Sequence, residues 1–345
     1  MKFSAILPLA AIATAVIPSF AAAAGNATIS VLTNNVYFLS EILYPNWGQR
    51  TRAQLIANSD YIKNHDVIVL QECFDNDPCN VLRDGLRSQC RFIAIQSSTK
   101  FAVLPDHMEV LIVQFMPPDP YQTPTVGQTK SGWDSTSGSY STTAPENGGT
   151  LILSKWPITQ KHQFVYKNAC GADWFSNKGF AYVTINYRGA NVHVFGTHMQ
   201  SDDKGCSAGQ AAQCRADALN AWRSYIDGRN IPANELVIMA GDFNIKRDTA
   251  EFNSLLTRLN ANQPSTYNGH PWTWDTATNE IAHYNYPNDP SEYIDFVLTD
   301  KKHKAVKSAV QTTHKLNSPE YVLKGVAYHE YSDHYPVQTV IEFDL

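Results

Sequence analysis

Short apolar segments recur along the chain and alternate with amphipathic segments of helical period. Alternating or continuous apolar runs predict β-strands, and apolar residues spaced by three and four predict helices. The predicted strands are 28–32, 67–70, 150–153, 180–187, 192–196, 236–240, 294–298 and 337–343. The predicted helices are 51–64, 214–226 and 249–259. Because strands outnumber helices and the helices lie between pairs of strands, we expect an α/β fold with two packed sheets flanked by helices.

Residues suited to metal or phosphate chemistry stand at or near the ends of these predicted strands. They are Asn35, Glu72, His198, Asp242, Asn244, Asp295, Asp333 and His334. Strand ends in a packed sheet form a rigid rim, on which carboxylates and imidazoles can surround a divalent cation and an anionic substrate. The pattern predicts a metal-assisted hydrolase and favours a phosphodiesterase.

Glu72 is the leading candidate for a metal ligand, because Mg²⁺ prefers hard oxygen ligands and often takes only one or two from protein. Asn35 could assist it, with a turn role as the alternative. Asp242 and Asn244 place two short polar side chains on the same side of the chain. Such a pair can hold a phosphoryl oxygen, a metal-bound water or a nucleophilic water, and an Asx turn is the structural alternative.

His334 is the best candidate for a general base, a role that needs a near-neutral pKa and an orienting partner. Asp295 could fix its tautomer, as an Asp does in a hydrolytic triad. His198 could donate a hydrogen bond to a phosphate oxygen or leaving group, although a lone His is most often structural. Asp333 is expected to contact the metal or nearby backbone. The chain lacks a Gly-x-Ser-x-Gly motif, which disfavours a Ser-His-Asp acyl-transfer triad.

The first residues have the pattern of a secretory signal peptide, with Lys2, an apolar stretch over 3–20 and small residues over 21–24. The apolar stretch is short and interrupted, which disfavours a membrane anchor. We therefore expect residues 1–24 to be a signal peptide and the protein to be soluble, secreted and extracellular. No linker divides residues 25–345, so we expect a single domain.

The formal net charge is −5 and no basic stripe is present, so a nucleic-acid partner is not expected. The six cysteines are Cys73, Cys79, Cys90, Cys170, Cys206 and Cys214. In an oxidising compartment this even number is compatible with disulfides, and fifteen pairings are open. No pair of cysteines has the C-x-x-C spacing that is typical of a zinc site, which disfavours zinc binding.

Further segments carry a more specific likeness. They are residues 35–37, the Tyr-Pro-Asn-Trp-Gly-Gln run at 44–49, the Ser-Gly-Trp-Asp run at 131–134, and residues 138–140, 176–180 and 196–198. With these, the chain resembles the endonuclease/exonuclease/phosphatase superfamily and, within it, the secreted bacterial sphingomyelinase C family, which includes the staphylococcal beta-toxin. The likeness covers nearly all of the chain after Asn26. It implies a DNase I-like, four-layer α/β/β/α sandwich and hydrolysis of sphingomyelin in membranes to ceramide and phosphocholine.

The resemblance also implies roles for the candidate residues. Glu72, with Asn35 beside it, would hold a central Mg²⁺, for which Mn²⁺ or Co²⁺ are alternatives. His334 would be the general base, oriented by Asp295. The supporting residues would be His198 and Asn244 for the phosphoryl group, Asp242 for the metal-bound water network, and Asp333 on the metal side.

A second, side-edge metal site would by the same resemblance involve Glu146, Asp173 and the backbone of Phe74. Asn147 stands where the family more often has Asp. The likeness pairs Cys170 with Cys206, and it leaves Cys73 and Cys79 to close a short loop.

Two segments depart from the family pattern. Residues 90–118 look inserted between 86–88 and 120–124, and they are interpreted either as a surface hairpin or as a gene-model artefact such as a retained intron. Membrane-active relatives carry an aromatic-tipped hairpin before the Ser-Asp-His run. Here the segment lacks Trp and Phe and offers only Tyr321, Val322 and Leu323. We therefore expect shallow bilayer insertion and no strong haemolysis.

Two other functions stay open at this point. One is a secreted nuclease or other phosphodiesterase of the same fold, which the superfamily motifs alone do not exclude. The other is a non-catalytic membrane-binding module with a vestigial site. If the protein hydrolyses sphingomyelin, we expect a monomer in peripheral contact with membranes. The preference among phospholipid head groups is left open.

Overall fold

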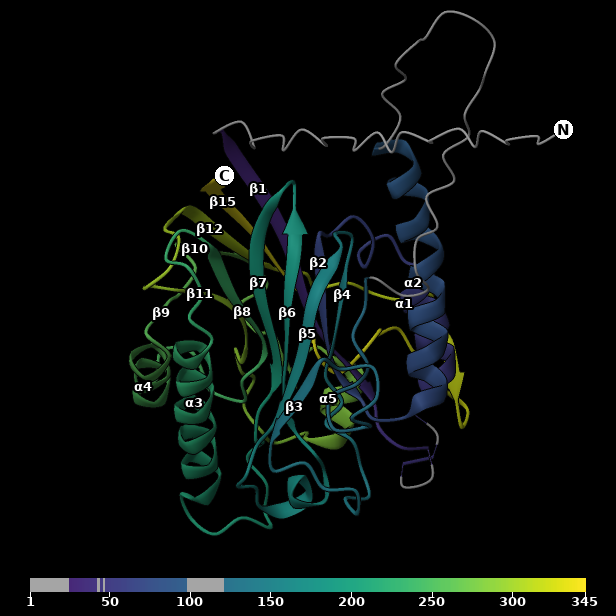
Figure 1. Ribbon diagram of the computed structural model, residues 1–345. Coiled ribbons are helices and arrows are strands. Elements are labelled where there is room, and N and C mark those ends of the chain that lie inside the picture. Colours follow the sequence, from purple (N-terminus) through teal and green to yellow (C-terminus); the bar gives the residue numbers. More distant parts are fainter. Residues whose placement is uncertain (1–24, 42–43, 46, 98–120) are drawn as a thin grey trace, which may run out of the picture.

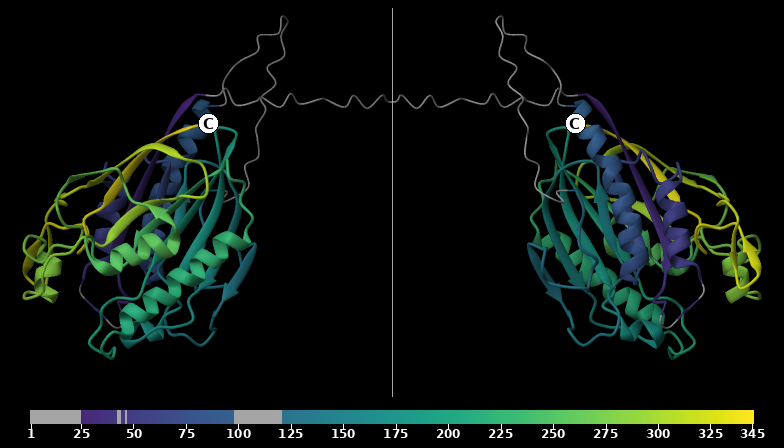
Figure 2. Two further views of the ribbon diagram at one scale, coloured as in Figure 1. Left: turned by 90° about the vertical axis from the view of Figure 1, so that its left-hand side faces the viewer. Right: turned by 90° about the vertical axis from the view of Figure 1, so that its right-hand side faces the viewer.

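The computed structural model describes residues 25–41, 44–45, 47–97 and 121–345, and the side chains of 87–97 are not among the described ones. Two β-sheets pack face to face, with a pair of helices on each outer side (Figure 1). The side views show α3 and α4 on one outer face and α1 and α2 on the other (Figure 2). The predicted α/β/β/α sandwich is confirmed.

The first sheet has the strand order β10-β12-β15-β1-β2-β4. Its strands are β1 (Asn26–Phe38), β2 (Val67–Cys73), β4 (Leu151–Ser154), β10 (Thr266–Gly269), β12 (Val306–Thr313) and β15 (Val337–Asp344). The central strands β1 and β2 are parallel, and β15 runs antiparallel to β1. The carboxyl ends of β1 and β2 therefore lie at the same edge of the sheet.

The second sheet has the order β3-β5-β6-β7-β8-β11-β9. Its strands are β3 (Ser135–Gly138), β5 (Ile158–Val165), β6 (Gly179–Tyr187), β7 (Ala190–His198), β8 (Leu236–Asp242), β9 (Ala261–Asn262) and β11 (Asp295–Asp300). The strands β7 and β8 are parallel, whereas β11 is antiparallel to β8. The end of β8 thus meets the start of β11, where Asp242 pairs with Asp295. A separate hairpin is formed by β13 (Tyr321–Leu323) and β14 (Val326–Tyr328).

Helices cover both outer faces because the central strands are apolar on both sides. Along β7, Val192 and Val194 face the core between the sheets, whereas Phe195 faces the helices. The helices α1 (Gln49–Asn58) and α2 (Asn76–Ser97) pack on the first sheet, and α3 (Gln210–Gly228) and α4 (Ala250–Leu259) on the second. A short helix α5 (Glu280–Asn285) and a 3₁₀-helix η1 (Gly171–Phe175) lie in the connections. No helix among the described residues is long and apolar enough to cross a bilayer.

Several boundaries differ from the predicted ones. The strands β1 and β2 extend to Phe38 and Cys73, so Asn35 and Glu72 lie within strands rather than after them. The helix predicted over 51–64 is α1, which starts earlier and ends at Asn58, because Ser59 has extended backbone. Helix α2 continues through residues 90–97, so the start of the suspected insertion is helical and not a hairpin. Residues 98–118 and the predicted signal peptide lie outside the described residues.

The predicted Cys170–Cys206 disulfide is confirmed, and it joins residues 36 apart in sequence. The expected Cys73–Cys79 bridge is wrong, because both residues are buried free thiols, as is Cys214. Burial and a hydrogen bond with Cys79 raise the pKa of the Cys73 thiol, which keeps it protonated.

Trp222 anchors the packing of α3 on the second sheet, as its helical spacing predicts. Its indole is fully buried, with ring centroids 5.4 Å from Phe180 and 5.8 Å from Phe243. We expect Trp222→Ala to lower the free energy of unfolding by about 3–5 kcal/mol, through lost burial and the cavity left behind. Denaturant unfolding would measure this loss, and Trp222→Phe, which keeps the ring stacking, should lose much less. A near-neutral Trp222→Ala would contradict this role.

Candidate active site

The predicted site residues converge where the strands β1, β2, β7, β8 and β11 meet, at the lower end of both sheets in Figure 1. Two backbone features shape this rim. Glu72 and Asn244 both have positive φ angles, 56° and 51°. Non-glycine residues adopt this conformation at a free-energy cost, and such residues cluster at functional sites. A Cβ on Gly241 would lie 2.1 Å from the carbonyl oxygen of Thr197, so only glycine lets β7 and β8 approach here.

Asn35 connects the acidic residues of the rim. Its Nδ2 donates to Glu72 Oε1 at 2.8 Å and to Asp242 Oδ2 at 3.1 Å. Its Oδ1 accepts the backbone N–H of Tyr37 at 3.1 Å. In this orientation Asn35 positions the carboxylates through its nitrogen, and a metal-ligand role would require the amide oxygen to turn toward the ion.

His334 and Asp295 form a buried pair, with 2.9 Å between His334 Nδ1 and Asp295 Oδ2. The other ring nitrogen, Nε2, points to the rim and lies 3.8 Å from Asp242 Oδ2. Ser332 fixes the loop by donating to the Asn35 carbonyl at 2.6 Å and accepting the His334 backbone N–H at 3.3 Å. This is the orientation in which a carboxylate holds a histidine for proton abstraction by Nε2.

His198 lies at the end of β7, beside Asp242 and Glu72. Its Nε2 is 3.6 Å from Asp242 Oδ2 and 3.9 Å from Glu72 Oε1. Lys178 Nζ lies 3.1 Å from the same nitrogen and forms an ion pair of 2.7 Å with Asp173. The ring nitrogen Nε2 therefore accepts from Lys178. To donate to a phosphoryl oxygen it would have to lose that bond and carry the ring proton, which is the other tautomer of the neutral imidazole.

Asp242 and Asn244 form the Asx turn that was the structural alternative, because Asn244 N–H donates to Asp242 Oδ1 at 2.9 Å. The turn leaves Asp242 Oδ2 facing Asn35. Asn244 Nδ2 donates to the Met199 carbonyl at 3.1 Å, which retains one amide hydrogen for another acceptor. The turn thus positions both side chains on the rim and does not replace the predicted chemistry.

The rim concentrates buried acidic groups, and their pKa values reflect it. Burial, followed by the charge of Asp333, raises the pKa of Glu72 to about 7. Burial, followed by Asp295, raises the pKa of Asp242 to about 7. Burial also raises the pKa of Asp333. These shifts mean that negative charge is held here at a free-energy cost, which a bound cation would relieve.

The unpaired atoms of the rim fit a divalent cation. Among the described residues, no group hydrogen-bonds the buried atoms Glu72 Oε2 and Asp295 Oδ1. One ligand atom each from Asp242, Asp295 and His334 lies within 4.8 Å of the others. His334 already engages Asp295, whereas Glu72 Oε2 has no hydrogen-bond partner among the described residues and could hold the cation. Hard oxygen donors of this kind suit Mg²⁺.

The backbones of the side-edge residues are bonded to neighbouring segments. Glu146 N–H donates to the Phe175 carbonyl at 3.1 Å, the Glu146 carbonyl accepts the Asn177 N–H at 3.1 Å, and the Phe74 carbonyl accepts from Asn147 Nδ2 at 2.8 Å. Both carboxylate oxygens of Asp173 are engaged, one by Lys178 and the other by Ser201. A second metal at these residues stays a prediction.

Two cations of the site were missed by sequence reasoning. Lys178 is buried beside His198, and Arg52 is fully buried, donating to the carbonyls of Val36 and Tyr37 near Asp333. Lys178 belongs to the 176–180 segment that supported the family resemblance, so the motif contained a signal for it. Arg52 lies in a helix of ordinary composition, and nothing in the local pattern distinguishes it.

The metal-free protein is expected to lose stability as pH rises from about 4 to 7. Asp242 has a folded pKa of about 7 against an ordinary value of 3.8, so in this window the folded state binds more protons than the unfolded state. The unfolding free energy then falls with rising pH. Glu72, whose pKa is raised from 4.5 to about 7, acts in the same direction within this window, and His334, whose pKa is raised above 6.5, does so at higher pH. In EDTA, the melting temperature of wild type should fall relative to that of Asp242→Asn as pH rises from about 4 to 7. A difference that stays constant over this range would contradict the raised pKa of Asp242.

The chain is similar in sequence and in fold to one family of proteins. The sequence matches the Endonuclease/Exonuclease/phosphatase family over residues 32–334. It is 41% identical to a phospholipase C of Staphylococcus aureus, over 90% of this chain and 86% of that protein. Sphingomyelinase C from Streptomyces griseocarneus superposes with a TM-score of 0.81 at 40% identity, covering 91% and 99% of the two chains. A beta toxin variant of Staphylococcus aureus with bound magnesium ions gives the same TM-score, identity and coverage.

The chain therefore belongs to the Endonuclease/Exonuclease/phosphatase family and, within it, to the bacterial sphingomyelinase C and beta-toxin group. Members of this family are hydrolases, and in this chain the buried group Asp242, Asp295 and His334 could hold a divalent metal.

Proposed function

We propose that this protein is a Mg²⁺-dependent sphingomyelin phosphodiesterase that releases phosphocholine and leaves ceramide. The observation that carries the proposal is the His334–Asp295 pair, which faces Glu72 and Asp242 across the rim. Identity near 40% over most of the chain to proteins named phospholipase C and sphingomyelinase C supports the substrate class.

In the proposed mechanism, His334 Nε2 removes a proton from the water that attacks phosphorus. Burial opposes protonation of His334, but Asp295 and Asp333 outweigh it and raise its pKa in the metal-free protein. A cation held on Glu72 would lower this pKa toward neutrality, so that neutral imidazole is present to accept the proton. Asp295 holds Nδ1–H, so Nε2 is left to accept the proton. When bound on Glu72, the divalent cation supplies positive charge that stabilises the phosphate and the leaving alkoxide.

The other rim residues would stabilise charge on the phosphoryl group. Burial, followed by Lys178 and His334, lowers the pKa of His198 well below its ordinary value, so His198 is neutral. The ammonium of Lys178 is fixed beside it by Asp173. His198 and Asn244 would donate hydrogen bonds to phosphoryl oxygens, while Lys178 contributes fixed positive charge, and such preorganised electrostatics is worth most in a buried site.

Aromatic rings near the rim suit a choline head group. Trp274 pairs in an isolated β-bridge with His334, and its ring centroid lies 5.3 Å from that of Tyr286. Burial raises the pKa of Tyr286 to about 12, and the charges of Asp333 and Glu72 add to this effect, so its phenol is neutral and lies near the rim. Aromatic faces attract quaternary ammonium groups. Trp274 is thus linked directly to the site through its backbone bridge with His334.

Secretion, monomeric state and peripheral membrane contact are parts of the same proposal. Secretion is supported by the signal-like sequence at the start of the chain and by the Cys170–Cys206 disulfide, which suits an oxidising compartment. The nuclease alternative is not favoured, because the close relatives are named for lipid hydrolysis.

The direct test is phosphocholine release from sphingomyelin vesicles by purified protein, with Mg²⁺ and with EDTA. We expect release with Mg²⁺ and at least a hundredfold loss in EDTA. Phosphatidylcholine and ceramide phosphoethanolamine vesicles would define the head-group preference, and supercoiled plasmid would test the nuclease alternative. Plasmid nicking without phosphocholine release would overturn the proposal.

A further inference from the structure

Two large aromatic side chains project from the 3₁₀-helix η1. Trp174 is 68% exposed and Phe175 is 51% exposed, and their rings meet edge to face at 5.1 Å. The helix η1 is the short teal helix at the lower end of the molecule in Figure 1, the end that carries the active site. Exposing two adjacent large aromatic residues to water is unfavourable, so a contiguous pair of this kind points to a binding surface.

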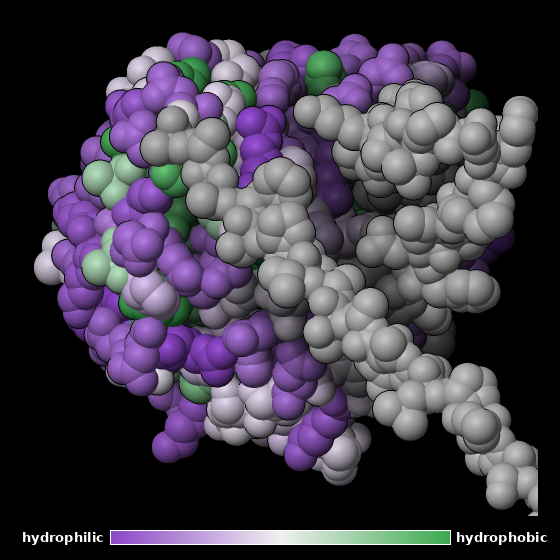
Figure 3. All heavy atoms as spheres, turned by 45° about the horizontal axis from the view of Figure 1, so that its top comes forward, coloured by the Kyte–Doolittle hydropathy of each residue, from purple (hydrophilic) through white to green (hydrophobic). Residues whose placement is uncertain are grey.

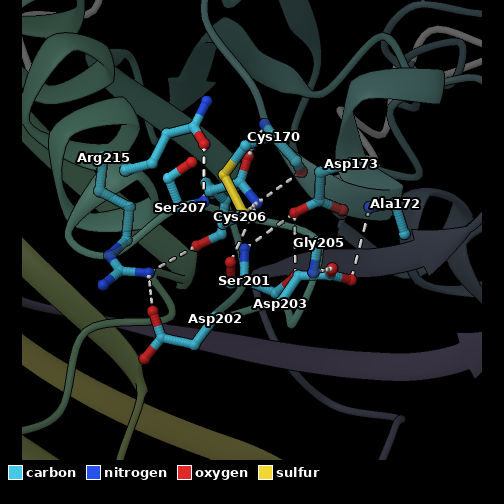
Figure 4. Close-up of a disulfide and its surroundings, with 12 residues drawn as sticks. Cys170, Ala172, Asp173, Ser201, Asp202, Asp203, Gly205, Cys206, Ser207 and Arg215 are labelled. Atoms are coloured by element: carbon cyan, nitrogen blue, oxygen red, sulfur yellow. Dashed lines mark hydrogen bonds and ion pairs between the residues drawn. A yellow bond between two sulfur atoms is a disulfide. The ribbon is translucent and has the colours of Figure 1, made fainter.

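The loop that carries this pair is held firmly to the body (Figure 4). The Cys170–Cys206 disulfide closes its base, and Asp203 accepts the backbone N–H of Ala172. Asp173 accepts from both the backbone and the hydroxyl of Ser201, at 2.8 and 3.0 Å. The aromatic pair is therefore presented on a rigid support rather than on a mobile tip.

The same loop is connected to the active site. Asp173, which precedes Trp174, binds the buried Lys178, and Lys178 contacts His198 on the rim. On the other side, Glu146 N–H donates to the carbonyl of Phe175 at 3.1 Å. A surface engaged by Trp174 and Phe175 would thus be fixed at a defined position relative to the catalytic rim.

The β13–β14 hairpin does not offer an equivalent aromatic surface. Tyr321, expected to contact membranes, is buried against Tyr328, and its hydroxyl donates to the Glu330 carbonyl. The exposed large residues of the hairpin are Val322 and Val326. The expected role of Tyr321 is therefore wrong, because Tyr321 faces the protein. On the face shown in Figure 3, which includes the end of the sheets away from the site, the visible described residues are mainly hydrophilic.

We propose that Trp174 and Phe175 dock the protein on a zwitterionic lipid bilayer and so bring the active-site rim to its lipid substrate. The inference rests on the proposed function, which places the substrate in a bilayer. Trp favours the bilayer interface, where its ring is buried and its N–H stays hydrated. Glu146 and Asp203 bond the backbone of η1 beside the pair, Asp202 is neutralised by Arg215, and Lys204 follows Asp203. The loop therefore carries no excess of positive charge that would favour an anionic surface over a phosphocholine surface.

The test compares Trp174→Ser/Phe175→Ser with Val322→Ser/Val326→Ser and wild type. Each protein is sedimented with vesicles of phosphatidylcholine and sphingomyelin, and phosphocholine release is measured from the vesicles and from a water-soluble phosphocholine ester. We expect the η1 variant to lose at least tenfold in vesicle binding and vesicle turnover, and less than twofold on the soluble ester. The hairpin variant should lose less than threefold in either assay.

A fluorescence measurement separates docking from a change in folding. Brominated phosphatidylcholine should quench part of the tryptophan emission of wild type, and Trp174→Phe should lose that part while keeping most of its vesicle binding. Replacing a third of the phosphatidylcholine with phosphatidylserine should leave binding unchanged or weaken it. A requirement for phosphatidylserine would overturn the choice of a zwitterionic surface.

The remaining outcomes keep this inference distinct from the proposed function. If wild type cleaves neither substrate but binds vesicles through the η1 pair, the docking inference stands and the proposed function fails. Equal vesicle binding by wild type and the η1 variant would overturn docking, even with full activity. An equal loss on vesicles and on the soluble ester would also overturn it, since the pair would then support the catalytic rim itself.

Discussion

Replacing His334 with alanine is expected to lower turnover of sphingomyelin by about 10²–10⁴-fold, the usual contribution of a general base. The variant should fold, because it removes a ring from a rim that the Ser332 and Asn35 bonds hold independently. Binding of substrate should change little, so the loss should fall on kcat more than on KM. Rates with Mg²⁺, together with melting temperatures, would measure both effects.

His314 provides a matched control for this substitution. Its imidazole bonds Gln338 Oε1 at 3.0 Å and makes no contact with the rim. His314→Ala should retain turnover within about twofold. Asp295→Asn gives a second measurement, since it preserves the shape of the pair but removes the charge that raises the pKa of His334, and its pH–rate profile should shift to lower pH. A stable His334→Ala protein with the wild-type rate would exclude this mechanism.

The fold followed from the sequence because its strands are strongly patterned. The segment 236–240 is apolar throughout, and 180–187 is apolar except for Thr184 and Asn186, which is typical of strands buried on both faces. Pairs of such strands need helices on both outer sides, so the sequence pattern alone predicts the four layers. The boundaries were less certain, because they depend on capping and on strand pairing. The extension of β2 to Cys73, for example, is set by its pairing with β1.

The candidate site was predictable where chemistry coincided with a strand end. Glu72, His198, Asp242, Asp295 and His334 each follow or begin an apolar segment, and the fold brings them to one rim. The sequence pattern does not predict the orientation of individual side chains. Whether Asn35 presents its nitrogen or its oxygen to Glu72 depends on a backbone N–H two residues away.

Buried cations and surface aromatics were harder to find, because their roles depend on distant segments. The role of Lys178 follows from its contacts with Asp173 and His198, which only the folded structure shows. A large aromatic residue such as Trp174 is expected in the core, but Trp174 is exposed. Tyr321 is expected at the surface, but it is buried. Single residues outside regular elements have no periodicity to reveal which way they face.

Glu72→Gln is expected to abolish most metal-dependent behaviour while leaving the metal-free protein at least as stable as wild type. In wild type, Mg²⁺ at 100 times its Kd should add about 2.7 kcal/mol to the free energy of unfolding. Glutamine keeps the shape and a carbonyl oxygen for Asn35 but loses the charge that attracts the cation. The added stability should then fall below about 0.5 kcal/mol at the same Mg²⁺ concentration, and turnover should drop by at least a hundredfold.

The metal-free comparison separates a ligand from a merely structural glutamate. Above pH 7 the Glu72 carboxylate is charged, buried and repelled by Asp333. Without a metal, removing this charge therefore removes its desolvation and repulsion cost and raises the free energy of unfolding. Glu235 bonds His193 at the far end of the second sheet, and Glu235→Gln should keep the full Mg²⁺-dependent rise in melting temperature. Calorimetry of the three proteins in EDTA and in Mg²⁺ decides the point. A Glu72→Gln protein that is stabilised by Mg²⁺ as strongly as wild type would move the cation to Asp242 and Asp295, whose ligand atoms also converge.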